Sequence, residues 1–303
     1  MGESPYTIAL DLGGTDLKAA RVSATGEVLE FRRTPSRADE SSEAMLATLH
    51  AASRPWLSGA RALGAGIPGV IHPATGTLVD RTPHLPLPPD FAIRDALARE
   101  LRLPVVADND ANCAAFGEYR AGAARGARVA VVVTVGTGIG CGIVIEGRLL
   151  RGAWGGAGEI GHAAHSSPGP ECACGVEGCI EPRSGGGGLA ARARAAGLAG
   201  DGARDVFAAA EAGSTAARSL LDDMADALAR QVGGAVQTLN PDVVVIGGGV
   251  AHAGEALLAP LRERLTRYVQ PSHRRGLRIV PAALGNRAGV VGAGLLAWEA
   301  DAS

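Results

Sequence analysis

TIALDLGGTDLKAARV, residues 7–22, and VAVVVTVGTGIGCGIVI, residues 129–145, are the two stretches that decide the fold. Each is an apolar run, a turn of glycine and threonine, and a second apolar run, a pattern typical of two strands joined by a tight turn. The two stretches read as a weak internal repeat, one copy in each half of the chain. They therefore predict two domains of related topology that face each other across a cleft.

Period-two and period-3.6 apolar runs alternate along the remaining chain, which predicts an α/β fold. We expect further strands at 62–67, 105–108 and 243–246, and helices at 42–56, 91–102, 111–120, 215–239, 255–268 and 289–299. The length of 303 residues suits two domains. We place a smaller N-terminal α/β domain at 1–119 and a larger one at 120–287, with the nearly apolar C-terminal helix, 288–303, packing back on the first. The glycines at 185–188 predict a flexible run inside the second domain.

Composition excludes several classes of function. The formal net charge is −2 and 47% of residues are hydrophobic, which describes a globular protein and not a binder of nucleic acid. Lys18 is the only lysine, so neither a P-loop nor the strand lysine of a protein kinase is present. Nucleotide phosphates would have to be held by backbone N–H groups, hydroxyls and a metal.

The sequence also bears on location. No basic and apolar signal segment opens the chain, and the longest charge-free apolar stretch, Val129 to Ile145, is too short and too rich in glycine to span a membrane. Five cysteines, three of them within eight residues, suit metal binding better than disulfides. We therefore expect a cytoplasmic protein with no membrane partner.

Three glycine turns are candidates for nucleotide binding. Asp11-Leu12-Gly13-Gly14-Thr15 lies between two strands, where Asp11 could hold Mg²⁺ and Thr15 could donate to a phosphate oxygen. The second turn, 136–140, repeats this design; it is followed by a strand, so a Rossmann reading fails. The third, Gly247-Gly248-Gly249, ends an apolar strand and could lie against a flat ring such as adenine. An ordinary hairpin turn is the alternative for any one of them alone.

Asn109 and Asp110 follow a predicted strand and open a predicted helix. The helix dipole favours an ionised Asp110, which could act as base toward a hydroxyl group. A plain N-cap is the alternative role for this pair.

Glu159, His162, Cys172, Cys174, Cys179 and Glu181 form the most specific cluster of the sequence. One imidazole and three thiolates make a closed tetrahedral set for a structural Zn²⁺. Such a site would fix a loop so that Glu159, His162 and Glu181 face one point, where they suit the hydroxyl groups of a sugar. A zinc loop with incidental surface acids is the alternative.

Together these motifs resemble the ROK family of bacterial sugar kinases and repressors, within the actin-like sugar-kinase superfamily. The resemblance is collinear and rests on DLGGTDLK at Asp11, GAGIPGVI at Gly64, DNDANCAAFGE at Asp108, the glycine-rich block ending at His162, CACGVEGCIE at Cys172 and LNPDVVVIGGGVA at Leu239. It implies a two-domain actin-like fold with an interdomain cleft, and a glucokinase-like enzyme that transfers phosphate from Mg-ATP to the 6-hydroxyl of a hexose.

The resemblance also implies the roles of particular residues. Asp110 would be the base, and sugar contacts would come from Gly69, Asn109, Asp110, Glu159, His162 and Glu181. Phosphate contacts would come from Asp11, Gly13, Gly14, Thr15, Thr137 and Gly138, and adenosine contacts from Gly247, Gly248 and Gly249. Zinc ligands would be His162, Cys172, Cys174 and Cys179. A homodimer or homotetramer fits such an enzyme.

Three positions depart from the family pattern. Asp16 stands where lysine or asparagine is frequent, His84 stands in the sugar loop where asparagine is frequent, and Pro182-Arg183 follows Glu181 where small or aromatic residues are usual. Nothing in the sequence explains the Pro182-Arg183 pair.

Several alternatives remain open from the sequence. A repressor needs a helix-turn-helix ahead of the first glycine turn, and only ten residues precede Asp11. A sensor that binds sugar without turnover, and a hydrolase with Asp110 and Glu159 as its carboxylate pair, are rivals of other classes. Glucose is the first choice of substrate, with N-acetylmannosamine, N-acetylglucosamine, fructose and allose as alternatives. ATP is preferred to polyphosphate as the donor.

Overall fold

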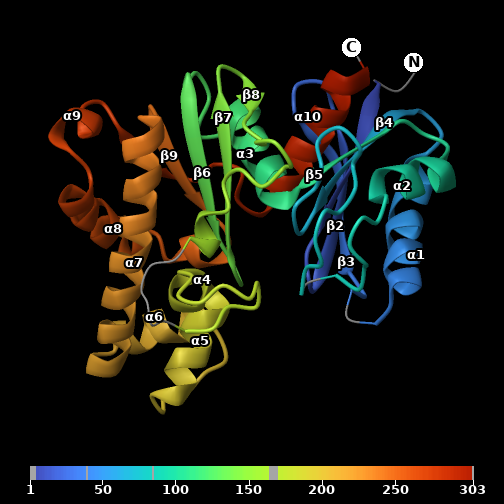
Figure 1. Ribbon diagram of the computed structural model, residues 1–303. Helices are drawn as coiled ribbons and strands as arrows, with labels where there is room; N and C mark the ends of the chain where they lie inside the picture. Colours follow the sequence, from blue (N-terminus) through green and yellow to red (C-terminus); the bar gives the residue numbers. More distant parts are fainter. Residues whose placement is uncertain (1–4, 39, 84, 164–169, 302–303) are drawn as a thin grey trace. The chain divides into compact units, whose positions relative to one another are not determined.

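The first glycine turn belongs to a five-stranded mixed sheet in the computed structural model, which describes residues 5–38, 40–83, 85–163 and 170–301 (Figure 1). Its strands are β1 (Tyr6–Leu12), β2 (Asp16–Val22), β3 (Val28–Pro35), β4 (Ala60–Ile67) and β5 (Val105–Asn109), in the order β3-β2-β1-β4-β5. The pairs β1/β2 and β2/β3 are antiparallel, and β1/β4 and β4/β5 are parallel. Every residue of β1 is buried, as expected for a strand covered on both faces.

Helices cover both faces of this sheet (Figure 1). They are α1 (Ser42–Ser53), the short η1 (Arg54–Trp56), α2 (Ile93–Leu101), α3 (Asp110–Ala121) and α10 (Ala288–Asp301). On β4, Leu63, Ala65 and Ile67 belong to the hydrophobic core that includes Met45 and Leu49 of α1. The alternate residues Gly64 and Gly66 face α10 and α3 instead.

The contact of α10 with this sheet and with α3 depends on glycines. A Cβ added at Gly64 would lie 1.8 Å from the carbonyl oxygen of Ala293, and one at Gly292 would lie 1.6 Å from that of Cys113. Because these backbones approach so closely, α10 buries its apolar residues against β1, β4 and α3.

The second sheet repeats the topology of the first. Its strands are β6 (Val129–Val135), β7 (Ile139–Ile145), β8 (Arg148–Leu149), β9 (Val243–Gly247) and β10 (Arg278–Pro281), in the order β8-β7-β6-β9-β10. The pairs β6/β9 and β9/β10 are parallel, as β1/β4 and β4/β5 are in the first sheet. The internal repeat expected from residues 7–22 and 129–145 is therefore confirmed at the level of topology.

The remaining helices follow the second sheet in the chain. They are η2 (Ile160–His162), α4 (Glu181–Ser184), α5 (Gly186–Ala195), α6 (Ala203–Glu211), α7 (Thr215–Leu239), η3 (Gly249–Ala253), α8 (Glu255–Tyr268), α9 (Pro271–Arg274) and η4 (Gly285–Arg287). Ser214 caps α7 by accepting a hydrogen bond from the N–H of Ala217, and Asn240 ends it in a left-handed conformation before Pro241.

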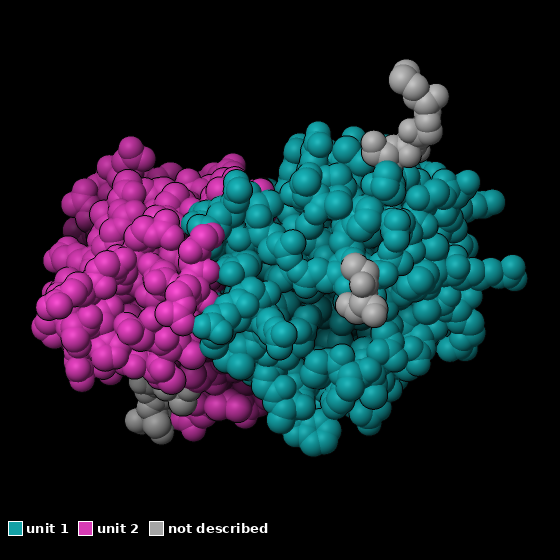
Figure 2. All heavy atoms as spheres, turned by 90° about the horizontal axis from the view of Figure 1, so that it is seen from above, with its two compact units in different colours: residues 1–125, 142–157, 286–303 teal, residues 126–141, 158–285 magenta. Residues whose placement is uncertain are grey.

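The chain divides into two compact units (Figure 2). Unit 1 consists of residues 1–125, 142–157 and 286–303, and unit 2 of residues 126–141 and 158–285. The segment 142–157, which includes most of β7 and all of β8, is counted with unit 1. The domain limits drawn from the sequence, 1–119 and 120–287, stay a prediction about independently folding domains.

The glycine run at 185–188 corrects the sequence-based expectation, because it is not flexible chain but the start of α5. Its N–H groups bond to the 136–138 turn, so the absence of side chains permits close packing here and not mobility. Within the described residues, no helix is both long enough and apolar enough to cross a membrane.

Candidate active site

In unit 1 the strand ends carry the predicted residues to one edge of the sheet. The register pairs Asp11 of β1 with Gly66 of β4, and Gly66 with Asp108 of β5. The next pair along is Ile67 with Asn109. Because the carboxyl ends of parallel strands meet at one edge, Asp11, Asn109 and Asp110 lie on the side where α/β folds bind ligands.

Asp11 is a buried carboxylate held from two sides. The Lys18 ammonium, its cross-strand partner on β2, lies 2.8 Å from its Oδ2. The first turn of α10 lies on it as well, because a Cβ at Gly289 would come within 2.5 Å of the Asp11 carboxyl carbon. Carboxylate oxygens are ligands that Mg²⁺ prefers, so Asp11 could hold this metal.

The turn after Asp11 is open to solvent and fixed by Ser36. The N–H of Gly13 donates to the carbonyl of Asp16 at 2.8 Å, and the Ser36 hydroxyl donates to the carbonyl of Gly14 at 3.0 Å. Gly14 and Thr15 are exposed, so their backbone and hydroxyl groups are accessible to an anion. The departure at Asp16 has a local partner, because its carboxylate pairs with Arg33 of β3.

Asn109 caps α3 and also fixes the Gly69 loop. Its Oδ1 accepts hydrogen bonds from the N–H groups of Ala111 and Asn112, and its Nδ2 donates to the carbonyl of Gly69 at 3.0 Å. Asn109, and not Asp110, therefore fills the cap position that was the alternative role for the pair. Asp110 is the first residue of α3, where the helix dipole favours its ionised form.

Arg151 is a contributor to this edge that the sequence reading missed. Its Nε donates to Oδ2 of Asp108 at 2.7 Å, and the Asp108 side chain is only 4% exposed. The other carboxylate oxygen of Asp108 accepts from the N–H of Asn109 and from Nδ2 of Asn112. Arg151 therefore ties the 151–157 loop to the residue that precedes the Asn109-Asp110 pair; an arginine 43 positions away gives no signal of this in the sequence.

In unit 2 the second and third glycine turns share an edge of the sheet. The register pairs Thr134 of β6 with Gly247 of β9. Gly248 has a φ of +85°, and a Cβ there would lie 2.5 Å from the carbonyl oxygen of Val135. The 247–249 turn therefore packs directly on the end of β6, which only glycine permits.

The start of α5 holds the 136–138 turn. The N–H of Gly186 donates to the carbonyl of Gly136 at 2.7 Å, and that of Gly187 donates to the carbonyl of Thr137 at 2.9 Å. Thr137 itself is exposed, so its hydroxyl is accessible to a phosphate. The glycines at the start of α5 therefore pack against this turn and hold it by hydrogen bonds.

Glu181 lies directly over the same turn. Its Oε2 accepts from the N–H of Ile139 at 2.8 Å, and a Cβ at Gly138 would lie 2.2 Å from that oxygen. Glu181 opens α4, and the departure at Arg183 now has an explanation. Arg183 lies 3.1 Å from Asp223 of α7, and its carbonyl accepts a hydrogen bond from Arg192 of α5 at 3.1 Å, so α4 is anchored from two helices.

His162 and Glu159 lie one turn of η2 apart, with Nε2 of His162 3.8 Å from Oε2 of Glu159. The loss of water around the Glu159 carboxylate raises its pKa; His162 acts in the opposite direction, and the charge of Glu181 adds to the rise. Glu159, His162 and Glu181 therefore interact electrostatically in unit 2, and their shared role in binding a sugar, expected from the sequence, stays a prediction.

The four zinc-ligand candidates gather in one cluster. The ligand atoms of His162, Cys172, Cys174 and Cys179 all lie within 4.8 Å of one another. The Cys172 Sγ is 3.5 Å from Nδ1 of His162, and the Cys174 Sγ is 3.6 Å from the Cys179 Sγ. Ligands about 2.3 Å from a tetrahedral Zn²⁺ lie ~3.7 Å apart, so the residues fit this metal. Nδ1 faces the thiols, which directs Nε2 toward Glu159.

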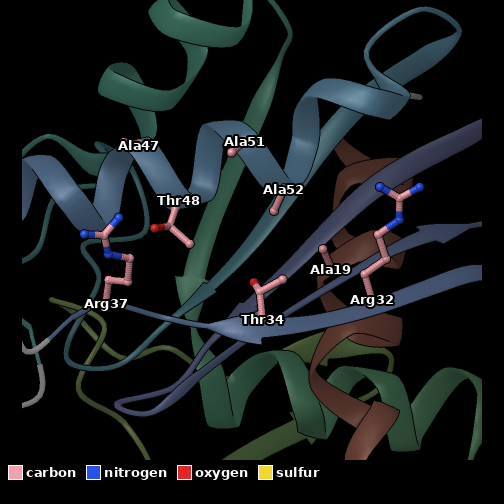
Figure 3. Close-up of a pocket in the computed structure, with 8 residues that line it drawn as sticks. All are labelled: Ala19, Arg32, Thr34, Arg37, Ala47, Thr48, Ala51 and Ala52. Atoms are coloured by element: carbon pink, nitrogen blue, oxygen red, sulfur yellow. The ribbon is translucent and has the colours of Figure 1, made fainter.

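A separate cavity of about 430 Å³ lies between α1 and strands β2 and β3 (Figure 3). Small side chains line most of it: Ala19 and Thr34 of the sheet, and Ala47, Thr48, Ala51 and Ala52 of α1. Arg32 and Arg37 stand at its two ends, and each pairs with a glutamate, Glu30 and Glu40 respectively. None of the predicted site residues lines this cavity.

Comparison with known proteins identifies the family. The chain belongs to the ROK family, whose model matches residues 7–300. It is 35% identical to the glucokinase of Halalkalibacterium halodurans over 98% of this chain and 96% of the relative. It is 38% identical to the N-acetylmannosamine kinase of Citrobacter koseri over 96% of this chain and 98% of the relative.

The fold is likewise shared with solved ROK structures. A ROK family glucokinase from Streptomyces griseus, crystallised with glucose and AMPPNP, superposes with a TM-score of 0.86 at 30% identity, over 97% of this chain and 99% of the other. The expected α/β fold of actin-like sugar kinases is therefore confirmed.

Proposed function

We propose that this chain is an ATP-dependent hexose kinase that converts glucose to glucose 6-phosphate. The observation that carries this proposal is the Asn109-Asp110 pair at the head of α3, in a chain related along its whole length to glucokinases. A carboxylate at a helix N-terminus, next to an amide that is already fixed by capping, is a suitable base for a sugar hydroxyl.

In the proposed reaction Asp110 accepts the proton of the 6-hydroxyl as the hydroxyl oxygen bonds to the γ-phosphorus of ATP and ADP leaves. Phosphoryl transfer has a loose transition state, so an ordinary aspartate suffices and positioning contributes most of the rate. The other residues that would contact the sugar are Gly69, Asn109, Glu159, His162 and Glu181.

The nucleotide contacts fall on the three glycine turns. Contacts to the phosphates would come from Asp11, Gly13, Gly14, Thr15, Thr137 and Gly138, and contacts to the adenosine from Gly247, Gly248 and Gly249. Asp11 would hold Mg²⁺, which neutralises charge on the phosphates when bound. Zn²⁺ on His162, Cys172, Cys174 and Cys179 would be structural, because four protein ligands leave no open position.

N-acetylmannosamine is the second candidate substrate, and the relatives give a specific reason for it. The N-acetylmannosamine kinases of Citrobacter koseri and Escherichia coli are 36–38% identical to this chain, slightly above the 34–35% of the two glucokinases. Glu159, His162 and Glu181 suit either sugar, since an acetyl group changes the demands on only a few side chains.

The test is an ADP-release assay with Mg-ATP and glucose, mannose, fructose, allose, N-acetylglucosamine or N-acetylmannosamine. We expect glucose to give the highest kcat/KM, and Asp110→Asn to lower kcat by about 10²–10⁴-fold while still binding the sugar. Asp95→Asn, in the first turn of α2, is the matched control and should retain full activity. Sugar binding without turnover in the wild-type protein would identify a sensor instead.

Assembly and location are further parts of the proposal. We infer a homodimer or homotetramer in the cytoplasm, supported by the frequency of symmetric homo-oligomers among soluble enzymes and by five cysteines that form no disulfide. Light scattering on a size-exclusion column would give the oligomeric state directly, and a monomer would contradict it.

A further inference from the structure

Trp154 is the most exposed large apolar side chain in the described part of the chain. It is 66% exposed, whereas Trp56 is 3% exposed. The indole N–H groups of Trp56 and Trp298 both donate within the protein, to Glu30 and to the carbonyl of Val22. No such hydrogen bond is found for Trp154 among the described residues. An indole held at the surface in this way has its face and its N–H accessible to a ligand.

The 151–157 loop holds Trp154 beside the proposed sugar contacts of unit 1. At its start Arg151 pairs with Asp108, which directly precedes Asn109. Just after Trp154, Gly155 packs on the Gly69 loop so closely that a Cβ there would lie 2.1 Å from the carbonyl oxygen of Ile71. The loop is therefore attached both to the Asn109-Asp110 segment and to the segment that begins at Gly69.

His72 packs against the indole of Trp154. The two rings are 5.5 Å apart at an interplanar angle of 64°, an edge-to-face pair. Nδ1 of His72 accepts from the N–H groups of Ala74 and Thr75, each at 3.3 Å. These two hydrogen bonds fix the ring of His72 to its own turn.

A hexopyranose needs both polar and apolar contacts from its binding site. Its hydroxyl groups require polar partners, which Asn109, Asp110 and the Gly69 loop offer, and its C–H faces require an apolar one. The indole of Trp154 is the exposed apolar surface attached to these polar groups. A ring whose hydroxyl groups are all equatorial presents C–H groups to an indole on both faces, whereas an axial hydroxyl interrupts the face to which it points. The axial hydroxyls of mannose and allose point to opposite faces.

We propose that Trp154, supported by His72, covers one C–H face of the sugar and so selects glucose over the epimer whose axial ring hydroxyl points to that face, either mannose or allose. The inference rests on the kinase function proposed above. It makes Trp154 a specificity-determining residue of that reaction.

The first experiment follows tryptophan emission while glucose is added in the absence of nucleotide. Covering an exposed indole moves its emission to shorter wavelength, so we expect a saturable shift in the wild-type protein and its loss in Trp154→Phe. Calorimetry on the same samples reports whether glucose binds. Binding without a shift would overturn the role of Trp154 and leave the kinase function intact, whereas no binding of any of the six sugars would overturn both.

The second experiment compares kcat and KM of variants. Trp154→Ala should raise the KM for glucose about tenfold or more with little change in kcat, and should reduce the preference for glucose over one of the two epimers, mannose or allose, more than over the other. Trp154→Phe should keep most of the preference. Leu29→Ala, at a residue of β3 that is 41% exposed, is the matched control and should behave as wild type. An unchanged KM in Trp154→Ala, or an emission shift that follows protein concentration instead of glucose, would overturn the proposal.

Discussion

Gly138 lacks a side chain because the carboxylate of Glu181 occupies that space. We predict that Gly138→Ala raises the KM for glucose by about 10–100-fold, because a Cβ 2.2 Å from Oε2 must displace Glu181. Gly136→Ala is the matched control two residues earlier: a Cβ there has nothing within 4 Å, and we expect a change of less than about threefold. Equal KM values for the two variants would contradict the placement of Glu181 among the sugar contacts.

Asp242 gives the stability of the protein a dependence on pH. Its carboxylate accepts from the N–H groups of Val129 and Arg128, both at 2.8 Å, and the bond from Val129 is the main cause of its lowered pKa. Because the folded pKa lies below the unfolded one, the stabilisation is complete above the ordinary carboxyl pKa of about 3.9 and is lost as the pH falls through the folded value.

We therefore predict that Asp242→Asn makes the free energy of unfolding less dependent on pH in the acid range. The difference in urea midpoint between wild type and variant should be larger at pH 6 than at pH 3. Asp242 is exposed, so the effect is small and needs matched buffers of equal ionic strength. A difference that grows toward pH 3 would contradict the assigned direction.

At the residue scale, much of the candidate site was predictable because strand ends and helix starts are visible in the sequence. Asp11 lies one residue before the end of β1, and Asp110 directly follows β5. Arg151 and Trp154 were missed because their roles depend on a loop that returns to the sheet from far along the chain. His84, in the predicted sugar loop, lies outside the described residues.

At the level of elements, α7 contains two adjacent glycines with opposite roles. Gly233 is buried, and a Cβ there would lie 2.8 Å from the Cβ of Tyr268 in α8. Gly234 is exposed, with nothing within 4 Å. We predict that Gly234→Ala stabilises the protein by about 0.5–1 kcal/mol, because alanine restricts the unfolded chain and favours the helix.

Gly233→Ala should instead destabilise it by about 1–3 kcal/mol, since α7 and α8 must separate to admit the methyl group. Urea unfolding of both variants measures the two effects in one experiment. The same sign for both changes would contradict the packing of α7 on α8.

The zinc cluster is the second element that a simple experiment can test. Cys113 and Cys141 are buried, and burial raises the pKa of the Cys141 thiol to about 12. We predict that no thiol of the metal-bound native protein reacts quickly with iodoacetamide, and that chelation makes Cys172, Cys174 and Cys179 reactive while Cys113 and Cys141 stay protected.

Cys174→Ser should lose zinc and lower both the melting temperature and the sugar affinity, because the metal fixes the loop that connects His162 to Glu181. Cys141→Ala removes a thiol outside the cluster and is the control for metal content. Unchanged sugar affinity in the metal-free variant would show that the loop holds its shape without zinc.

Elements with a strong apolar pattern were predicted well, whereas the edge strand β3 was not. The range 215–239 is confirmed for α7, because a continuous apolar stripe lies between a serine cap and a proline. Strand β3 was missed because its residues VLEFRRTP are half exposed and charged, as is usual for an edge strand. Helix α5 was missed because it begins with glycines, so its first turn shows no apolar residues at helical spacing.

At the scale of the whole molecule, unit 1 is assembled from three separate chain segments. Its last segment contains α10, whose residues from Ala288 to Ala297 are all buried. We predict that a fragment of residues 1–125 unfolds without cooperativity, because the face of β1 and β4 that α10 covers would be exposed.

A fusion of residues 286–303 to that fragment through a flexible glycine-serine linker should restore a cooperative transition. Circular dichroism during heating distinguishes the two samples. Cooperative unfolding of the unfused fragment would show that α10 is dispensable for the folding of this unit.

The ion pair between Lys18 and Asp11 has a practical consequence for handling the protein. In most proteins amine-reactive reagents modify a random selection of surface lysines. Here the only side-chain amine of the chain is Lys18, and it is paired at 2.8 Å with a buried carboxylate. Succinimide esters should therefore label the N-terminus almost alone, which would attach every molecule to a sensor chip in one orientation. Any labelling of Lys18 would then report directly on the opening of the first glycine turn.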